Sequence, residues 1–152
     1  MKVTSYSKPA SNLESLIDII LRTDTGRSVV EKITRRFGEG RIAVEQYPAH
    51  IAREVRAVLP EGHPIGACYF ENEKKIYVDF TGPAGLIAVY LTHEFALILE
   101  GSEAAALEVQ VRFTNELVKL DPDFAKFMTS WTKRAEILTD YLDDSDGEGQ
   151  AA

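Results

Sequence analysis

The sequence has little sulfur and few histidines: one cysteine, two methionines and three histidines in 152 residues. A single cysteine, Cys68, excludes an internal disulfide and any zinc site built from several thiolates. No apolar run approaches the roughly 18 residues of a transmembrane helix. Residues 1–12 lack the apolar core of a secretory signal. We therefore expect a cytoplasmic protein that does not act at a membrane.

Basic residues are also in the minority. The chain has 17 Lys and Arg against 24 Asp and Glu, which gives a formal net charge of −7. Part of this excess lies in the last ten residues, 143–152, where Asp143, Asp144, Asp146 and Glu148 have no basic neighbour. We expect this acidic tail to be disordered. Because non-specific binding of nucleic acid needs a basic surface, nucleic acid is not an expected partner.

What is present is the composition of one globular domain, with 45% hydrophobic and 27% charged residues. We expect this domain to cover residues 1–142. Two capping-box patterns, Ser11 with Glu14 and Ser28 with Glu31, predict the first two helices. The first is expected to end near residue 22, and Asp24-Thr25-Gly26 to separate it from the second.

The middle of the chain has the alternating pattern of half-buried strands. Residues 41–46 predict one strand, and residues 66–70 and 75–80 predict a hairpin around residues 71–74. Residues 49–59 predict a short helix between the first strand and the hairpin. The hairpin strand 75–80 has the strongest strand pattern of the chain, and 67–70 is the expected edge strand.

Three further helices are predicted over 82–100, 102–120 and 122–142. Pro83 suits a first helical turn, Gly101 suits a left-handed helix end, and Ser102 suits an N-cap. The fold class expected from all these elements is α+β. We expect a small antiparallel or mixed sheet of about three strands packed against five to six helices, with the 82–100 helix at the centre.

The 82–100 helix contains the one motif with recognisable chemistry, His93-Glu94-Phe95-Ala96-Leu97. It matches the zinc-binding pattern His-Glu-x-x-His except at its fifth position, where Leu97 stands instead of a histidine. In the full motif two histidines one turn apart ligate zinc, and the glutamate acts as general base on the metal-bound water. Glu94 also lies in an apolar helix, so it needs a partner, which we expect to be His93 or a residue of the neighbouring cleft.

The motif and the order of elements around it resemble the zincin-like metallopeptidases, in particular minimal gluzincin domains. The resemblance covers roughly residues 41–120. It implies that His93 and Glu103 are the remaining metal ligands, with Glu108 as the alternative to Glu103. It also implies that Glu94 is the former general base, and that Leu97 marks a lost ligand.

The resemblance further implies that the edge strand Ala67, Cys68, Tyr69 and Phe70 lines a substrate cleft. Our first functional hypothesis is therefore an inactive, metallopeptidase-like domain that binds a protein or peptide. It needs no cofactor, whereas zinc is expected if the metal site is retained.

Two alternatives remain open from the sequence. One is a zinc-dependent peptidase with an altered ligand set, such as His93, Glu103 and His63, with His50 as a less favoured replacement. The other is a helical interaction protein unrelated to peptidases. In that case the apolar face of the 122–142 helix, including Trp131, would form a homo-oligomer interface.

Overall fold

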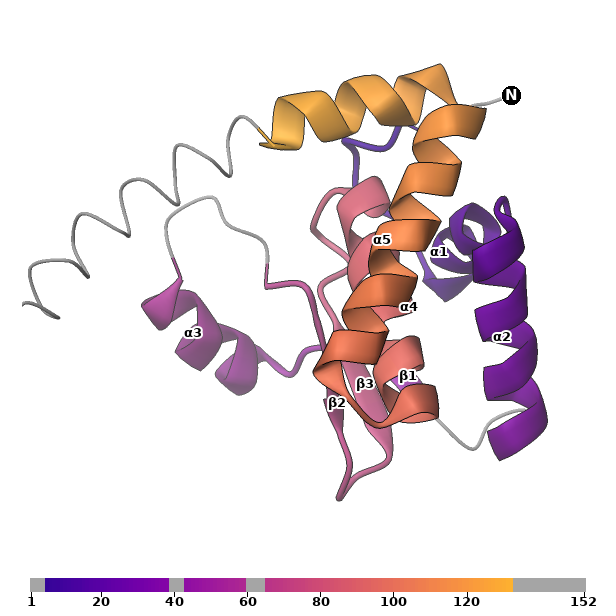
Figure 1. Ribbon diagram of the computed structural model, residues 1–152. Helices are drawn as coiled ribbons and strands as arrows, with labels where there is room; N and C mark the ends of the chain where they lie inside the picture. Colours follow the sequence, from indigo (N-terminus) through magenta and orange to yellow (C-terminus); the bar gives the residue numbers. More distant parts are fainter. Residues whose placement is uncertain (1–4, 39–42, 60–64, 133–152) are drawn as a thin grey trace, which may run out of the picture.

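One long helix, α4, lies at the centre of the molecule, and three helices and two strands pack against it (Figure 1). The computed structural model describes residues 5–38, 43–59 and 65–132, so the predictions for His63 and for the acidic tail lie outside the described residues. The named elements, in chain order, are α1 (Leu13–Ile20), α2 (Asp24–Phe37), β1 (Ala43–Gln46), α3 (Ala49–Val58), β2 (Ala67–Phe70), β3 (Lys75–Val78), α4 (Ala84–Glu100) and α5 (Glu103–Leu120). Residues 122–132 form a further helical segment.

The sheet has three strands in the order β1-β3-β2. β1 pairs with β3 in parallel, and β2 pairs with β3 in antiparallel, so the sheet is mixed. The central strand β3 is the most buried of the three, and its Ile76 and Val78 are fully buried. The predicted α+β class, the hairpin and the central position of the motif helix are therefore confirmed.

Helix α4 is apolar around most of its circumference, as expected for a helix packed on several sides. It contacts α1, α2 and α5 as well as β2 and β3. Its first N–H groups have no side-chain cap and are satisfied by the N-terminal segment instead: Ala84 donates to the Lys8 carbonyl at 2.8 Å, and Gly85 to the Tyr6 carbonyl at 3.0 Å. At its other end Gly101 takes the left-handed conformation (φ 76°), and its N–H donates to the Leu97 carbonyl.

The start of α2 differs from the sequence prediction. We expected residues 24–26 to separate α1 from α2, and Ser28 to be the N-cap of α2. Instead Thr23 is the N-cap, and its hydroxyl accepts a hydrogen bond from the Gly26 N–H at 2.8 Å. Gly26 lies in the first turn of α2, where the end of α1 approaches it closely. A Cβ at this position would lie 1.8 Å from the Ile20 carbonyl oxygen. The glycine therefore permits a tight corner between two helices rather than ending one of them.

Side chains from other elements form hydrogen bonds with backbone groups at the start of α2 and at the end of α4. The Glu116 carboxylate on α5 accepts hydrogen bonds from the Thr25 N–H at 2.9 Å and from the Thr25 hydroxyl at 2.5 Å. The Arg36 guanidinium donates to the carbonyls of Ile98 and Leu99 at the end of α4, at 3.3 and 3.2 Å. These bonds fix α2 across both α4 and α5.

The C-terminal helical segment packs its apolar face into the chain's own core. Phe124 is fully buried and Trp131 is buried. At the start of this segment the Tyr6 hydroxyl donates to Asp121 at 2.5 Å and accepts a hydrogen bond from Arg22. Burial and the bond to Asp121 raise the pKa of Tyr6 to about 12. Two segments far apart in sequence are thus joined beside the start of α4.

Helix α3 stands apart from the helices that pack around α4 (Figure 1). None of its residues is buried. An ion pair at 3.6 Å joins Arg56 of this helix to the buried Asp79, which follows β3. Among the described residues, no helix combines the length and the apolar character required to cross a membrane.

The Glu116 cap generates a test of stability. We expect Glu116→Ala to lower the free energy of unfolding by about 1–2 kcal/mol, because it leaves the Thr25 N–H at the start of α2 without its acceptor. Urea denaturation followed by circular dichroism measures the change. Glu108→Ala, which removes an exposed carboxylate from the same helix, is the matched control. Equal effects of the two substitutions would show that the cap contributes nothing specific.

Candidate functional site

Three of the residues singled out in the sequence lie together where α4 meets the start of α5. His93 Nε2 lies 3.0 Å from Glu103 Oε2 and 3.9 Å from Glu94 Oε2. The short Gly101-Ser102 turn reverses the chain between the helices, and the Ser102 hydroxyl accepts a hydrogen bond from the Ala105 N–H as the N-cap of α5. His93 is therefore paired with Glu103, the first residue of α5.

This pairing has a simple electrostatic basis. Glu103 stands in the first turn of α5, where a carboxylate is favoured by the partial positive charge of the helix N-terminus. Its side chain is 75% exposed, whereas that of His93 is only 17% exposed. The pair thus lies at the boundary between the core and solvent.

The other ring nitrogen of His93 has no hydrogen-bond partner in the described part of the chain. Nδ1 is buried and makes no hydrogen bond to any described residue. Histidines that ligate metals usually donate their second ring N–H to a carboxylate or a carbonyl, which fixes the orientation of the ring. His93 lacks that outer support in the described parts of the chain, so its environment fits a metal ligand incompletely.

Glu94 points to the sheet and is 8% exposed. Its Oε1 accepts a hydrogen bond from the Tyr69 N–H in β2 at 2.8 Å. Burial raises the pKa of Glu94 above its ordinary value, and the charge of Glu103 raises it further. The hydrogen bond from Tyr69 and the neighbouring His93 lower the pKa, but by less, so it remains raised. The expectation that Glu94 needs a partner is confirmed: the partner is the backbone amide of Tyr69, on the strand that was expected to line a cleft, and His93 lies 3.9 Å away.

The Tyr69 amide is available because of the register of β2. The Asp79 N–H donates to the Gly66 carbonyl at 2.9 Å, and alternate residues of an antiparallel strand face the partner strand. Cys68 and Phe70 therefore bond to β3, whereas the N–H and C=O groups of Ala67 and Tyr69 point away from it. β2 is an outer strand, so these groups form a sheet edge, and Glu94 occupies one of its donors.

Cys68 lies on this outer strand but has no feature of a nucleophile. It is exposed, yet neighbouring atoms desolvate the thiol and raise its pKa, and Glu94 raises it further. Tyr47 lies nearby and is buried. Burial raises the pKa of its hydroxyl, and the neighbouring Cys68, Glu94 and Asp79 raise it further. A thiol with a raised pKa is mostly protonated near neutral pH and reacts slowly.

The remaining candidate ligands do not join this group within the described residues. Leu97, one turn beyond His93, is partly buried, and Glu108 is exposed further along α5. His50 is exposed at the start of α3, and His63 lies outside the described residues. In the parts of the chain that the structure describes, no three His, Cys, Asp or Glu side chains are arranged to hold a metal ion.

Sequence reasoning identified His93, Glu94 and Glu103 but missed the Tyr69 amide. An apolar helix with one carboxylate signals that a partner is needed, but not which backbone group supplies it. No family model matches the chain, and comparisons with curated proteins and with solved structures give no match either. The zincin-like resemblance therefore rests on the motif and on the order of the elements.

The environment of Glu94 predicts a specific pH dependence. A carboxyl whose pKa is raised by folding stabilises the folded state below its ordinary pKa of 4.5, and this contribution is lost as the pH rises through the raised value. Glu94→Gln keeps an oxygen acceptor for the Tyr69 N–H and cannot ionise. We expect this variant to gain stability relative to the native chain between about pH 4 and pH 7.

Urea unfolding at several pH values measures this difference, and Glu108→Gln controls for loss of an exposed carboxylate. A constant offset between Glu94→Gln and the native chain is compatible with the argument, because the amide group differs from a carboxyl. A relative loss of stability of Glu94→Gln toward neutral pH would contradict it, because the ionised carboxylate would then stabilise the fold.

Proposed function

We propose that this chain is a zincin-like domain that no longer hydrolyses peptides and instead binds an extended peptide or protein segment along β2. The observation that carries the proposal is the sheet edge formed by Ala67 and Tyr69 beside the motif helix. In β-strand addition an incoming segment pairs with such an edge through backbone hydrogen bonds, and side-chain pockets add selectivity.

The state of Glu94 supports the loss of hydrolysis. A general base must reach the water that it activates, and in metallopeptidases the metal also lowers the pKa of that water. Here one oxygen of Glu94 is bonded to the Tyr69 amide. Leu97 occupies the position of the second histidine and has no atom that ligates zinc.

The same contact defines how a segment would bind. Because Glu94 already accepts from the Tyr69 N–H, the edge offers the Ala67 N–H and C=O and the Tyr69 C=O. An incoming strand pairs with these three groups without displacing Glu94. Selectivity then comes from side chains that contact the strand and α4, which pack against each other.

This proposal is tested by removing one edge donor. Ala67→Pro deletes the outward N–H but leaves the ladder bonds through Gly66, Cys68 and Phe70, and proline is tolerated at such edge positions. Ala67→Val keeps the N–H and is the matched control. The probe is a set of extended peptides selected from a random displayed library on the native protein.

We expect Ala67→Pro to weaken binding of these peptides about three- to tenfold, the effect of one backbone hydrogen bond, and Ala67→Val to bind like the native chain. Isothermal calorimetry measures the affinities, and amide NMR shifts of residues 67–70 locate the site. Peptides that bind equally to both variants, or that shift other amides only, would refute strand addition at β2.

A second candidate function is favoured by one distance. His93 Nε2 and Glu103 Oε2 are 3.0 Å apart, and a small side-chain rotation would give the roughly 3.4 Å that separates two ligand atoms of a tetrahedral zinc ion. With His63 as a third ligand, this pair would form the altered ligand set of a zinc-dependent peptidase, in which Glu94 acts as general base. The fit of His93 is incomplete, as its Nδ1 shows, so we place this function second.

Zinc content separates the two functions. We expect the native chain, purified without an affinity tag, to contain no stoichiometric zinc, and Leu97→His to contain about one zinc per chain because it restores the motif. Elemental analysis measures both, with the double variant His93→Ala and Leu97→His as the control.

Zinc in the native chain that is lost in His93→Ala would overturn the inactive-domain proposal in favour of the peptidase. Zinc in neither the native chain nor Leu97→His would remove the support for a zincin-like site altogether.

A further inference from the structure

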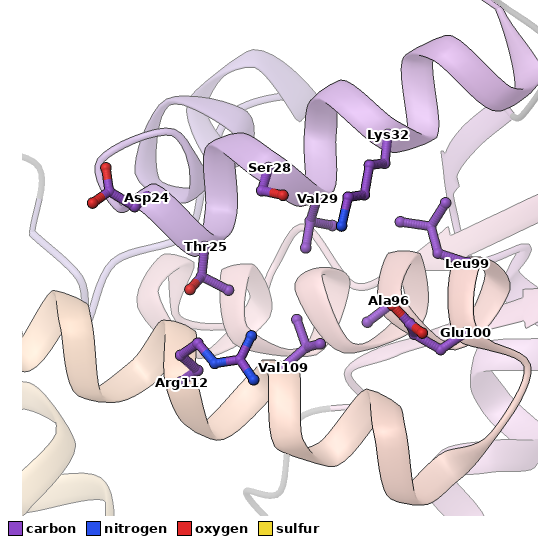
Figure 2. A pocket seen from close by; sticks show the side chains of 10 residues that line it. All are labelled: Asp24, Thr25, Ser28, Val29, Lys32, Ala96, Leu99, Glu100, Val109 and Arg112. Atoms are coloured by element: carbon purple, nitrogen blue, oxygen red, sulfur yellow. The ribbon is translucent and has the colours of Figure 1, made fainter.

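A groove lies between α2 and α5, with the end of α4 as its floor, and its lining does not include His93, Glu94 or Glu103 (Figure 2). Its volume is about 290 Å³. Val29 and Ala96 in its lining are buried, and Val109 is partly buried, so the floor is apolar. The volume is at the lower limit of pockets for small molecules, which typically span roughly 300–1,000 Å³.

Two cations from opposite walls border this groove. Lys32 extends from α2, and the Arg112 guanidinium extends from α5 toward the space beside Val109 (Figure 2). Within the described residues neither side chain has an acidic group within ion-pair distance. Other described cations, such as Lys119 and Lys126, also lack an acidic partner. What distinguishes Lys32 and Arg112 is that they border one groove from facing helices.

The acidic groups of the lining do not neutralise them. Asp24 lies at one end, its carboxylate points away from the groove, and it forms an ion pair with Arg27 (Figure 2). Glu100 lies at the other end with its carboxylate directed toward Ala96, and it makes no ion pair with Lys32 or Arg112 (Figure 2). The space over the apolar floor is therefore bordered by two cations, Arg112 and Lys32, and by one carboxylate.

We propose that this groove binds a small organic carboxylate with an apolar body. The planar guanidinium of Arg112 matches a carboxylate through two parallel hydrogen bonds, and Lys32 supplies a second positive charge from the facing wall. The hydrocarbon part of the ligand lies on Val29 and Val109. The site shares only Ala96 with the motif and uses none of its polar residues, and it stands whether or not the chain binds a peptide at β2.

The test uses hexanoate as the probe and follows backbone amide NMR shifts during titration of the full chain. We expect saturable shifts at residues 28–32 and 109–112 in the native protein. Arg112→Gln should weaken binding at least about tenfold, the effect of losing a hydrogen-bonded charge pair. Lys119→Gln removes a charge from the same helix outside the groove and should bind like the native chain.

Circular dichroism verifies that both variants are folded, and hexan-1-ol, which has the same chain length and no charge, is the control ligand. Equal affinity for hexan-1-ol would overturn the proposal, because recognition would then be apolar only. Equal weakening in Lys119→Gln would overturn it as well, because the effect would reflect overall charge. The absence of saturable shifts with hexanoate would also refute it.

Discussion

The burial of α4 is the constraint on which the rest of the structure depends. The first turn of this helix is buried, so its N–H groups need partners within the protein, and the carbonyls of its last turn, which lies nearer to solvent, find partners in the protein as well. Lys8 and Tyr6 do so at its start, and Gly101 and Arg36 at its end. The N-terminal segment, α2 and the turn into α5 are therefore held in place by the requirements of one helix.

The same constraint explains the candidate site. Glu94 is a carboxylate on a helix that is buried against the sheet, and an unpaired buried carboxylate is costly. The nearest solution in this fold is the outward amide of Tyr69 on the outer strand. In this fold the Glu94 carboxylate links the central helix to the outer strand of the sheet.

Much of the architecture could be predicted from local patterns. Gly101 and Ser102 marked the end of α4 and the start of α5 correctly, whereas Pro83, expected in the first turn of α4, is its N-cap. The alternating residues on both sides of 71–74 predicted the hairpin. Gly26 misled the prediction because glycine usually ends helices, whereas here it allows close approach to Ile20, a contact that only the tertiary structure defines. His93, Glu94 and Glu103 could be found by helical spacing, but the amide of Tyr69 and the groove beside Arg112 depend on strand register and helix packing, which spacing does not encode.

The turn between α4 and α5 has a consequence for how this molecule responds to any occupant. A link as short as Gly101-Ser102, with a capped helix on each side, leaves no hinge between His93 and Glu103. Their separation is set by helix geometry before anything binds. At this end of the protein only side-chain rotations can change the distance between His93 and Glu103. The backbones of α4 and α5 keep their relative position.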